Sequence, residues 1–200
     1  MANPTTPFGL IPRKELSSAV YNGGLMTFST AAGNATAIFV GDLVTLAGTS
    51  QIINGVVYSD VVQGATGNIF TGVVVAAIPV TRDSLPYRAA STQRLLVVNI
   101  DPNTEYEIRQ TAGGTPLSAN DVGLNANVST ATAGNTGYGW SGMALDNTTE
   151  ATTNTLDLKI TGMSSRPDNE VGTAAGTGSD SSTFFVRINR HQFANQIAGV

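Results

Sequence analysis

His191 is the only histidine of the chain, so any mechanism that needs an imidazole base depends on it. It follows a predicted strand and lies beside Arg190 near the C-terminus, and a serine–histidine–aspartate triad would have to use it. A lone histidine in this setting is more typical of a surface or an interface than of catalysis. We therefore expect Arg187, Arg190 and His191 to offer hydrogen-bond donors to an acidic or carbonyl-rich partner.

Two carboxylates, Glu105 and Glu107, alternate along one predicted strand and so share a face. Paired carboxylates can hydrolyse glycosides or bind calcium. Arg109 shares that face and neutralises part of the charge, and the glycine and terminal glutamate of a calcium loop are absent. The pattern favours a solvated strand face, and a small hydrolase is the least favoured interpretation.

Tyr138 and Trp140 lie in a glycine-rich loop and form a possible platform for a sugar ring. The alternative is that Trp140 packs on the end of a barrel. The glycine pairs lack the strand–loop–helix context of a phosphate-binding motif, and the chain has no cysteine. The sequence therefore predicts no cofactor, no metal site and no enzymatic activity.

The charge content is low: 12% of residues are charged, against about 25% in ordinary globular proteins. The net charge is −4, and the few basic residues are scattered, which argues against a nucleic-acid partner. No apolar run approaches the ~20 residues that span a bilayer, and no signal peptide is recognisable, so we expect a soluble protein made in a cytoplasm.

Strand-sized segments separated by glycine-rich turns recur along the chain, and no amphipathic helix of useful length is visible. Asn54-Gly55 between β-branched pairs predicts a type I′ hairpin, and Ser118 is a candidate cap for one helical turn. The pattern predicts an all-β fold, a compact barrel or sandwich of jelly-roll or tulip type. The expected strands are 41–48, 69–75, 94–100, 105–109, 156–160 and 184–188, and the predicted hairpin spans 52–57.

The organisation we predict is an extended N-terminal arm (1–24), a β-rich body (25–163) and a C-terminal segment (164–200). Prolines hold the arm extended. Its apolar residues Phe8, Leu10 and Ile11 either dock into a neighbour's groove or lie on the chain's own core.

The C-terminal segment begins with a polar turn and continues through a flexible loop, 171–182, to a last strand. In the turn, Pro167 keeps Arg166 extended. Arg166 then either presents its guanidinium to a partner or pairs locally with Asp168 or Glu170.

Several stretches together resemble the capsid decoration proteins of tailed bacteriophages, which are also called cement or head-stabilising proteins. The turn 166–170 and the closing Ile-Asn-x-His-Gln at 188–192 are the most specific parts. The matching stretches are 3–4, 8–10, 21–23, 39–44, 87–92, 101–102, 121–127, 158–160, 166–170 and 188–192.

The resemblance implies a structural protein on the exterior of a virion, bound to the major capsid protein of an icosahedral shell and made in the bacterial host. It implies no catalytic residue. It also implies self-association on a local symmetry axis, with a trimer favoured and a dimer possible. The competing function is a carbohydrate-binding or host-adhesion module displayed on a virion, with Tyr138 and Trp140 as its platform.

Overall fold

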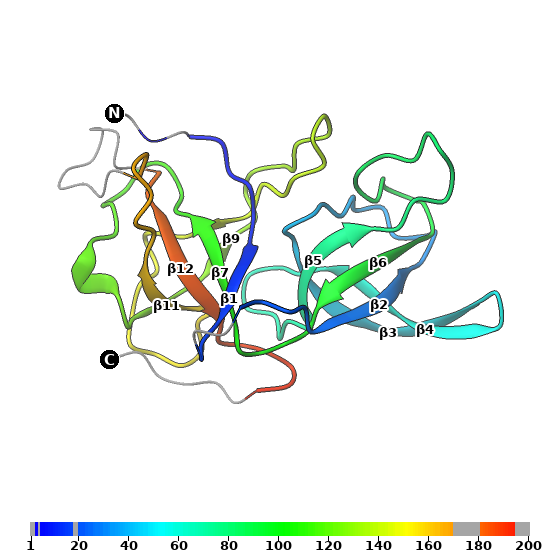
Figure 1. The fold of residues 1–200 in the computed structure, drawn as a ribbon, viewed down its shortest axis with the longest axis horizontal. Coiled ribbons are helices and arrows are strands. Elements are labelled where there is room, and N and C mark those ends of the chain that lie inside the picture. Colours follow the sequence, from blue (N-terminus) through cyan, green and yellow to red (C-terminus); the bar gives the residue numbers. More distant parts are fainter. Residues whose placement is uncertain (1–2, 4, 18–19, 170–180, 195–200) are drawn as a thin grey trace.

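The computed structural model describes residues 3, 5–17, 20–169 and 181–194, and it confirms the all-β prediction. The described strands form two lobes that lie side by side, a closed barrel and a five-stranded sheet (Figure 1). The one helical element of these residues is the 3-10 turn η1 (Ala119–Asp121), which Ser118 caps as expected.

The barrel lobe closes in the order β2-β4-β3-β5-β6. Its strands are β2 (Leu25–Thr30), β3 (Leu43–Ile53), β4 (Val56–Gln63), β5 (Gly72–Ala77) and β6 (Arg94–Asn99).

The sheet lobe has the order β1-β7-β12-β11-β8, and a separate ribbon pairs β9 with β10. Its elements are β1 (Ile11–Glu15), β7 (Thr104–Arg109), β8 (Asn125–Ala126), β9 (Val128–Ser129), β10 (Ala144–Leu145), β11 (Leu158–Met163) and β12 (Thr183–Ile188).

The hairpin between β3 and β4 follows the sequence prediction. Ile53 pairs with Val56, and the two residues between them both have positive φ, 51° at Asn54 and 80° at Gly55. Positive φ at both central positions is the requirement of a type I′ turn, and asparagine followed by glycine meets it with little strain.

Two hydrophobic cores meet at the junction of the lobes. The barrel core includes Phe28, Val61 and Leu96, and the sheet-lobe core includes Tyr106 and Phe184. Three residues of the barrel side of the chain join the sheet-lobe core instead of the barrel core. These residues are Leu43, Phe70 and Val73. The lobes therefore share apolar packing and are not independent domains joined only by a linker.

Two buried arginines fasten the loops at one end of the barrel. The Arg88 side chain is 0% exposed and donates to the carbonyls of Ala31, Thr36 and Thr92. Arg94 donates to other loop carbonyls in the same way. Burial lowers the pKa of both guanidinium groups. Carbonyls of irregular backbone need partners when they are buried, and a guanidinium supplies several donors at once.

The predicted division into arm, body and C-terminal segment differs from the structure. The stretch 25–163 contributes strands to both lobes, and β12 of the predicted C-terminal segment is the central strand of the sheet. The N-terminal stretch is also part of the sheet, because β1 pairs with β7. Of the loop 171–182, only Ser181 and Ser182 belong to the described residues, and Glu170 lies outside them.

The expectation of a solvated face on 105–109 is wrong. Every residue of β7 is buried, including Glu105 at 5%, Glu107 at 1% and Arg109 at 6% exposure. The alternation was read correctly for Tyr106 and Ile108, which enter the sheet-lobe core. The second face is covered because the side chains of Arg13, from the neighbouring strand β1, and of Arg166, from the turn after β11, reach the Glu107 carboxylate.

Candidate functional site

The N-terminal stretch from Phe8 to Lys14 lies between the lobes and takes part in two surface hollows. It includes most of β1, an edge strand of the sheet. Ile11 and Pro12 line an apolar hollow, and Arg13 and Lys14 line a polar one. One short strand therefore supplies side chains to both, and we treat these two hollows as the candidate contact surfaces of the molecule.

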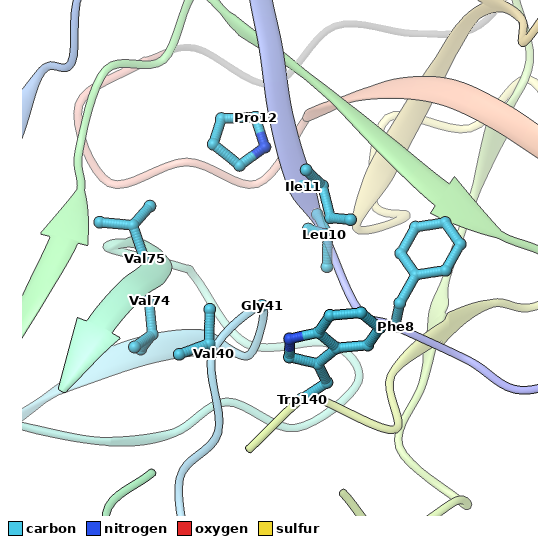
Figure 2. A pocket seen from close by; sticks show the side chains of 9 residues that line it. All are labelled: Phe8, Leu10, Ile11, Pro12, Val40, Gly41, Val74, Val75 and Trp140. Atoms are coloured by element: carbon cyan, nitrogen blue, oxygen red, sulfur yellow. The ribbon is translucent and has the colours of Figure 1, made fainter. Parts of the chain in front are cut away.

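The apolar hollow, here called the junction pocket, has a volume of about 270 Å³. Figure 2 shows Trp140 beside Phe8 on one side of the pocket and barrel valines on the other. None of the lining residues is charged. They are Phe8, Leu10, Ile11, Pro12, Val40, Gly41, Val74, Val75 and Trp140.

The floor of the junction pocket is a close approach of three backbone segments. Leu10 N donates to Gly41 O at 3.0 Å, and Gly41 N donates to Val74 O at 2.8 Å. Gly41 has φ +92°, and a Cβ there would lie 2.9 Å from the carbonyl oxygen of Phe8. Only glycine accepts both the left-handed backbone and this contact.

Among the predicted contact residues of the N-terminus, Leu10 differs from Phe8 and Ile11 in its burial. Leu10 is 1% exposed and belongs to the sheet-lobe core, so it is anchored in its own chain and cannot dock into a partner. Phe8 and Ile11 are half-buried at the pocket. The interpretation that this segment lies on its own core is therefore correct for Leu10.

The polar hollow, here called the charged groove, has a volume of about 480 Å³. It lies over Glu107, which accepts hydrogen bonds from Arg13 and, at 3.1 Å, from Ser164 Oγ. Its lining residues are Arg13, Lys14, Glu107, Ser164, Ser165, Arg166 and Phe185.

Each of the two carboxylates of β7 contacts a hydroxyl and at least one cation, and Glu107 contacts two cations. Arg166 Nη1 lies 3.5 Å from Glu107 Oε1. Glu105 pairs with Lys14 at 3.3 Å and accepts from Thr161 Oγ1 at 2.8 Å. These contacts hold the cations in place. They also occupy both carboxylates, so neither is accessible to act as the general acid or base in glycoside hydrolysis.

Arg166 takes the local alternative. Its guanidinium pairs with Asp168 at 2.9 Å as well as with Glu107. The Asp168 carboxylate raises the pKa of Arg166. Asn169 N donates to the carbonyl of Arg166, which closes the predicted turn. The Arg166 side chain still exposes 44% of its surface at the rim of the groove.

Arg109 contacts the N-terminal segment from beneath. Its Nη1 donates to the carbonyl of Thr6 at 2.8 Å, and its guanidinium lies 5.1 Å from the centre of the Phe8 ring. Burial lowers its pKa. A cation over an aromatic face is attractive, so Arg109 helps to fix Phe8 at the junction pocket.

The three predicted donors near the C-terminus do not join this surface. His191 is 2% exposed and forms a parallel bridge with Phe70, so it belongs to the junction of the lobes and not to an exposed patch. Burial lowers the pKa of His191 to about 4, with Asp101 raising it and Arg187 lowering it. Arg190 donates to the carbonyl of Thr155 at 3.1 Å.

Tyr138 and Trp140 form the exposed aromatic pair that the sequence suggested. Their ring centres lie 5.9 Å apart at 38°, and the residues are 72% and 51% exposed. Asn135 shapes the loop, because its carbonyl accepts from Gly139 N and its side-chain oxygen accepts from Gly137 N. Trp140 also lines the junction pocket. Sugar stacking on the pair stays a prediction.

Sequence reasoning missed the barrel side of the junction pocket. Val74 and Val75 were predicted only as strand residues and Val40 was given no role of its own, and nothing local marks the three as lining a hollow. The charged groove carried a usable signal, since Arg13 and Lys14 precede two strand carboxylates of opposite charge in a chain with few charges.

In the part of the chain that the structure describes, no group of three or more metal-ligating side chains comes together. No helix of that part is long and apolar enough to cross a membrane. Comparison with family models, with curated proteins and with solved structures gives no match to this chain.

Proposed function

We propose that this chain is a structural virion protein that binds the outer surface of an icosahedral bacteriophage capsid and stabilises it without catalysis. Its main partner is the major capsid protein, and it acts without cofactor, metal or nucleic acid. It is made in the bacterial cytoplasm, sits on the capsid exterior and associates with itself, as a trimer in preference to a dimer. The sequence resemblance gives this proposal its class of partner.

The observation that carries the proposal is the charged groove. Its three cations, Arg13, Lys14 and Arg166, expose 43%, 46% and 44% of their side chains, whereas the carboxylates of Glu105 and Glu107 are almost completely buried. The cationic hydrogen-bond donors of the groove therefore face solvent, and the carboxylate acceptors face the protein interior. Held in this way, the cations are pre-organised to meet carboxylates or carbonyls on a rigid partner.

A shell surface also suits contacts of this strength. A half-exposed cation contributes little in a single contact, because water and salt screen it. Many copies on one closed shell add their contacts through avidity. Binding to the shell should then weaken steeply as the salt concentration rises above about 0.1 M, where the Debye length falls below ~10 Å.

The experiment is occupancy of purified, undecorated shells by the wild type and by Lys14→Ala and Arg166→Ala. Loss of occupancy at an unchanged melting temperature, with restoration at low salt, supports the groove as the contact. Arg82→Ala is the matched control, because Arg82 is exposed in a loop away from the groove. Shells that bind the groove variants as well as the wild type refute this surface. Shells that bind no form of the chain refute the proposed function.

A second candidate is supported by the Tyr138–Trp140 pair, a virion-displayed module for carbohydrate or host adhesion. Two exposed, tilted rings offer faces on which a sugar can stack. Glycan-array binding that Trp140→Ala abolishes would favour this function. Phe193→Ala is the control, since Phe193 is similarly exposed at 55% in another part of the chain.

A further inference from the structure

The hairpin of β3 and β4 extends beyond the barrel. Residues 50–53 pair with 56–59 across the turn, whereas the pairing of β3 with β5 is confined to Leu43 and Val44 and that of β4 with β2 to Asp60. The outer part is therefore a two-stranded ribbon, and Figure 1 shows it pointing away from the sheet lobe. A lone two-stranded ribbon is marginally stable in water.

The end of this ribbon, here called the hairpin tip (Ile52 to Val57), is apolar and exposed. Ile52 is 74% exposed, Val57 66% and Val56 51%. Ile52 lies directly opposite Val57, so the two most exposed side chains form one apolar knob. No charged residue occurs between Asp42 and Asp60. Proteins usually guard such projecting edges with charges, and this one does not.

The junction pocket is a hollow of matching chemistry on the same chain. Its lining is apolar and uncharged, and its volume of about 270 Å³ is small. Small-molecule pockets begin at about 300 Å³, so the hollow suits a few side chains better than a whole ligand. It lies between the lobes, and the hairpin tip points away from it, so a copy cannot fill its own pocket (Figure 1).

We propose that the hairpin tip of one copy docks in the junction pocket of a second copy. An exposed apolar knob and an apolar hollow on one chain satisfy each other only between molecules. Such a contact is heterologous, since two different patches meet, and it generates a closed ring or an open chain of copies. A ring is the form that agrees with a small oligomer.

The contact is small. A few side chains cover much less than the ~1,200 Å² at which stable interfaces begin, so one contact gives transient association in solution. Closing a ring, or holding copies next to one another on a surface, raises the effective concentration and makes the same contact persistent.

Disulfide trapping tests the proposal, and the absence of native cysteine makes the readout clean. Two single variants, Val57→Cys in the hairpin tip and Val75→Cys in the junction pocket, are mixed under mild oxidation. Because each molecule carries one thiol, every product joins two copies. We expect the mixed dimer to form at least about tenfold faster than in a mixture of Val57→Cys with Val80→Cys, an exposed control position, because docking raises the local thiol concentration.

Equal rates for the two mixtures overturn the proposal. In decorated particles, a photoreactive maleimide attached to the Val57→Cys thiol that crosslinks to a shell subunit, with no tip–pocket product, assigns the hairpin tip to the shell and also overturns the proposal. As a second variant, Val57→Asp should abolish the rise of the sedimentation coefficient with protein concentration that we expect of the wild type, while its circular dichroism spectrum stays unchanged. This self-association is measured on the isolated chain, so its failure is independent of shell binding.

Discussion

At the scale of single residues, most of the rare charges fasten the molecule internally. Arg88 and Arg94 hold loops of the barrel, and Glu107 holds Arg13 and Arg166 over the sheet. Only 12% of the residues are charged. Because many of these side chains bind groups within the protein, neutral groups dominate the surface. That surface is well suited to contacts with protein.

Glu107→Gln is expected to lower the free energy of unfolding by about 1–3 kcal/mol, because charge-assisted hydrogen bonds to a buried carboxylate are lost. The half-exposed arginines regain water, which keeps the loss below that of a fully buried pair. Urea unfolding measures it. Asp168→Asn is the control and should lower stability less than Glu107→Gln does, since that carboxylate is at the surface and water screens its ion pair. Equal effects of the two substitutions would contradict the structural role of Glu107.

His191 should make stability depend on pH between about 6.5 and 4. Its pKa is lowered from 6.5 to about 4 in the folded chain, chiefly by burial. Below pH 6.5 the unfolded chain binds a proton that the folded chain refuses, so stability falls as the pH falls and levels off below about 4. At 1.36 kcal/mol for each pKa unit, the full loss is up to about 3 kcal/mol.

The measurement for His191 is the difference in unfolding free energy between the wild type and His191→Gln across that pH range. In the wild type, Phe193 N donates a hydrogen bond to His191 Nδ1 at 3.1 Å. The side-chain oxygen of glutamine can accept the same hydrogen bond. The carboxylates of Asp42 and Asp157, whose pKa values burial raises, titrate in both proteins and cancel. A difference that is constant with pH would show that His191 has the same pKa in the folded and unfolded chain, and would contradict the lowering by burial.

At the scale of elements, the N-terminal stretch is a strand of the sheet with one apolar anchor. Leu10 is fully buried, and β1 pairs with β7. Prolines and irregular apolar spacing look like an arm in the sequence, yet the segment completes the edge of the lobe. Its removal would strip both hollows of a wall.

Leu10→Ala should lower the free energy of unfolding by about 2–5 kcal/mol, the usual cost of a cavity in a packed core. Leu16→Ala is the matched control, because Leu16 is 38% exposed and should change stability by less than about 0.5 kcal/mol. Thermal and urea unfolding both report the change. A docking arm would give the opposite result, with Leu10→Ala as harmless as Leu16→Ala.

At the scale of the whole molecule, the lobes are joined by backbone and core together. Phe70 is 0% exposed and packs in the sheet-lobe core. Its N–H donates to the carbonyl of Arg190, and its carbonyl accepts from Gln192 N, both at 2.8 Å. Residues 190–192 thus pair with the segment that enters β5, and the lobes are expected to unfold as one unit.

Phe70→Ala should cost about 3–5 kcal/mol and split the calorimetric transition in two, because it removes the ring that links the lobes. Phe28→Ala removes a ring of the barrel core alone and should lower a transition that stays single. A single transition in Phe70→Ala would mean that the remaining backbone pairing is enough to couple the lobes.

The sequence by itself determined the β class, the strand-sized units, the Asn54-Gly55 hairpin and the turn after Arg166. These features follow from local rules, the period of a strand and the backbone freedom of turn residues, which act over a few positions. The same rules identified Tyr106 and Ile108 as core residues of their strand.

Only the tertiary structure decided what covers each face. Alternation along 105–109 shows that Glu105 and Glu107 share a side, but their burial depends on residues far away in the chain. Lys14 contacts Glu105, and Arg13 and Arg166 contact Glu107. The division into two lobes, the burial of Leu10 and His191, and both hollows arise in the same way. Each depends on pairing between distant segments, whose free energy comes from contacts that no local pattern records.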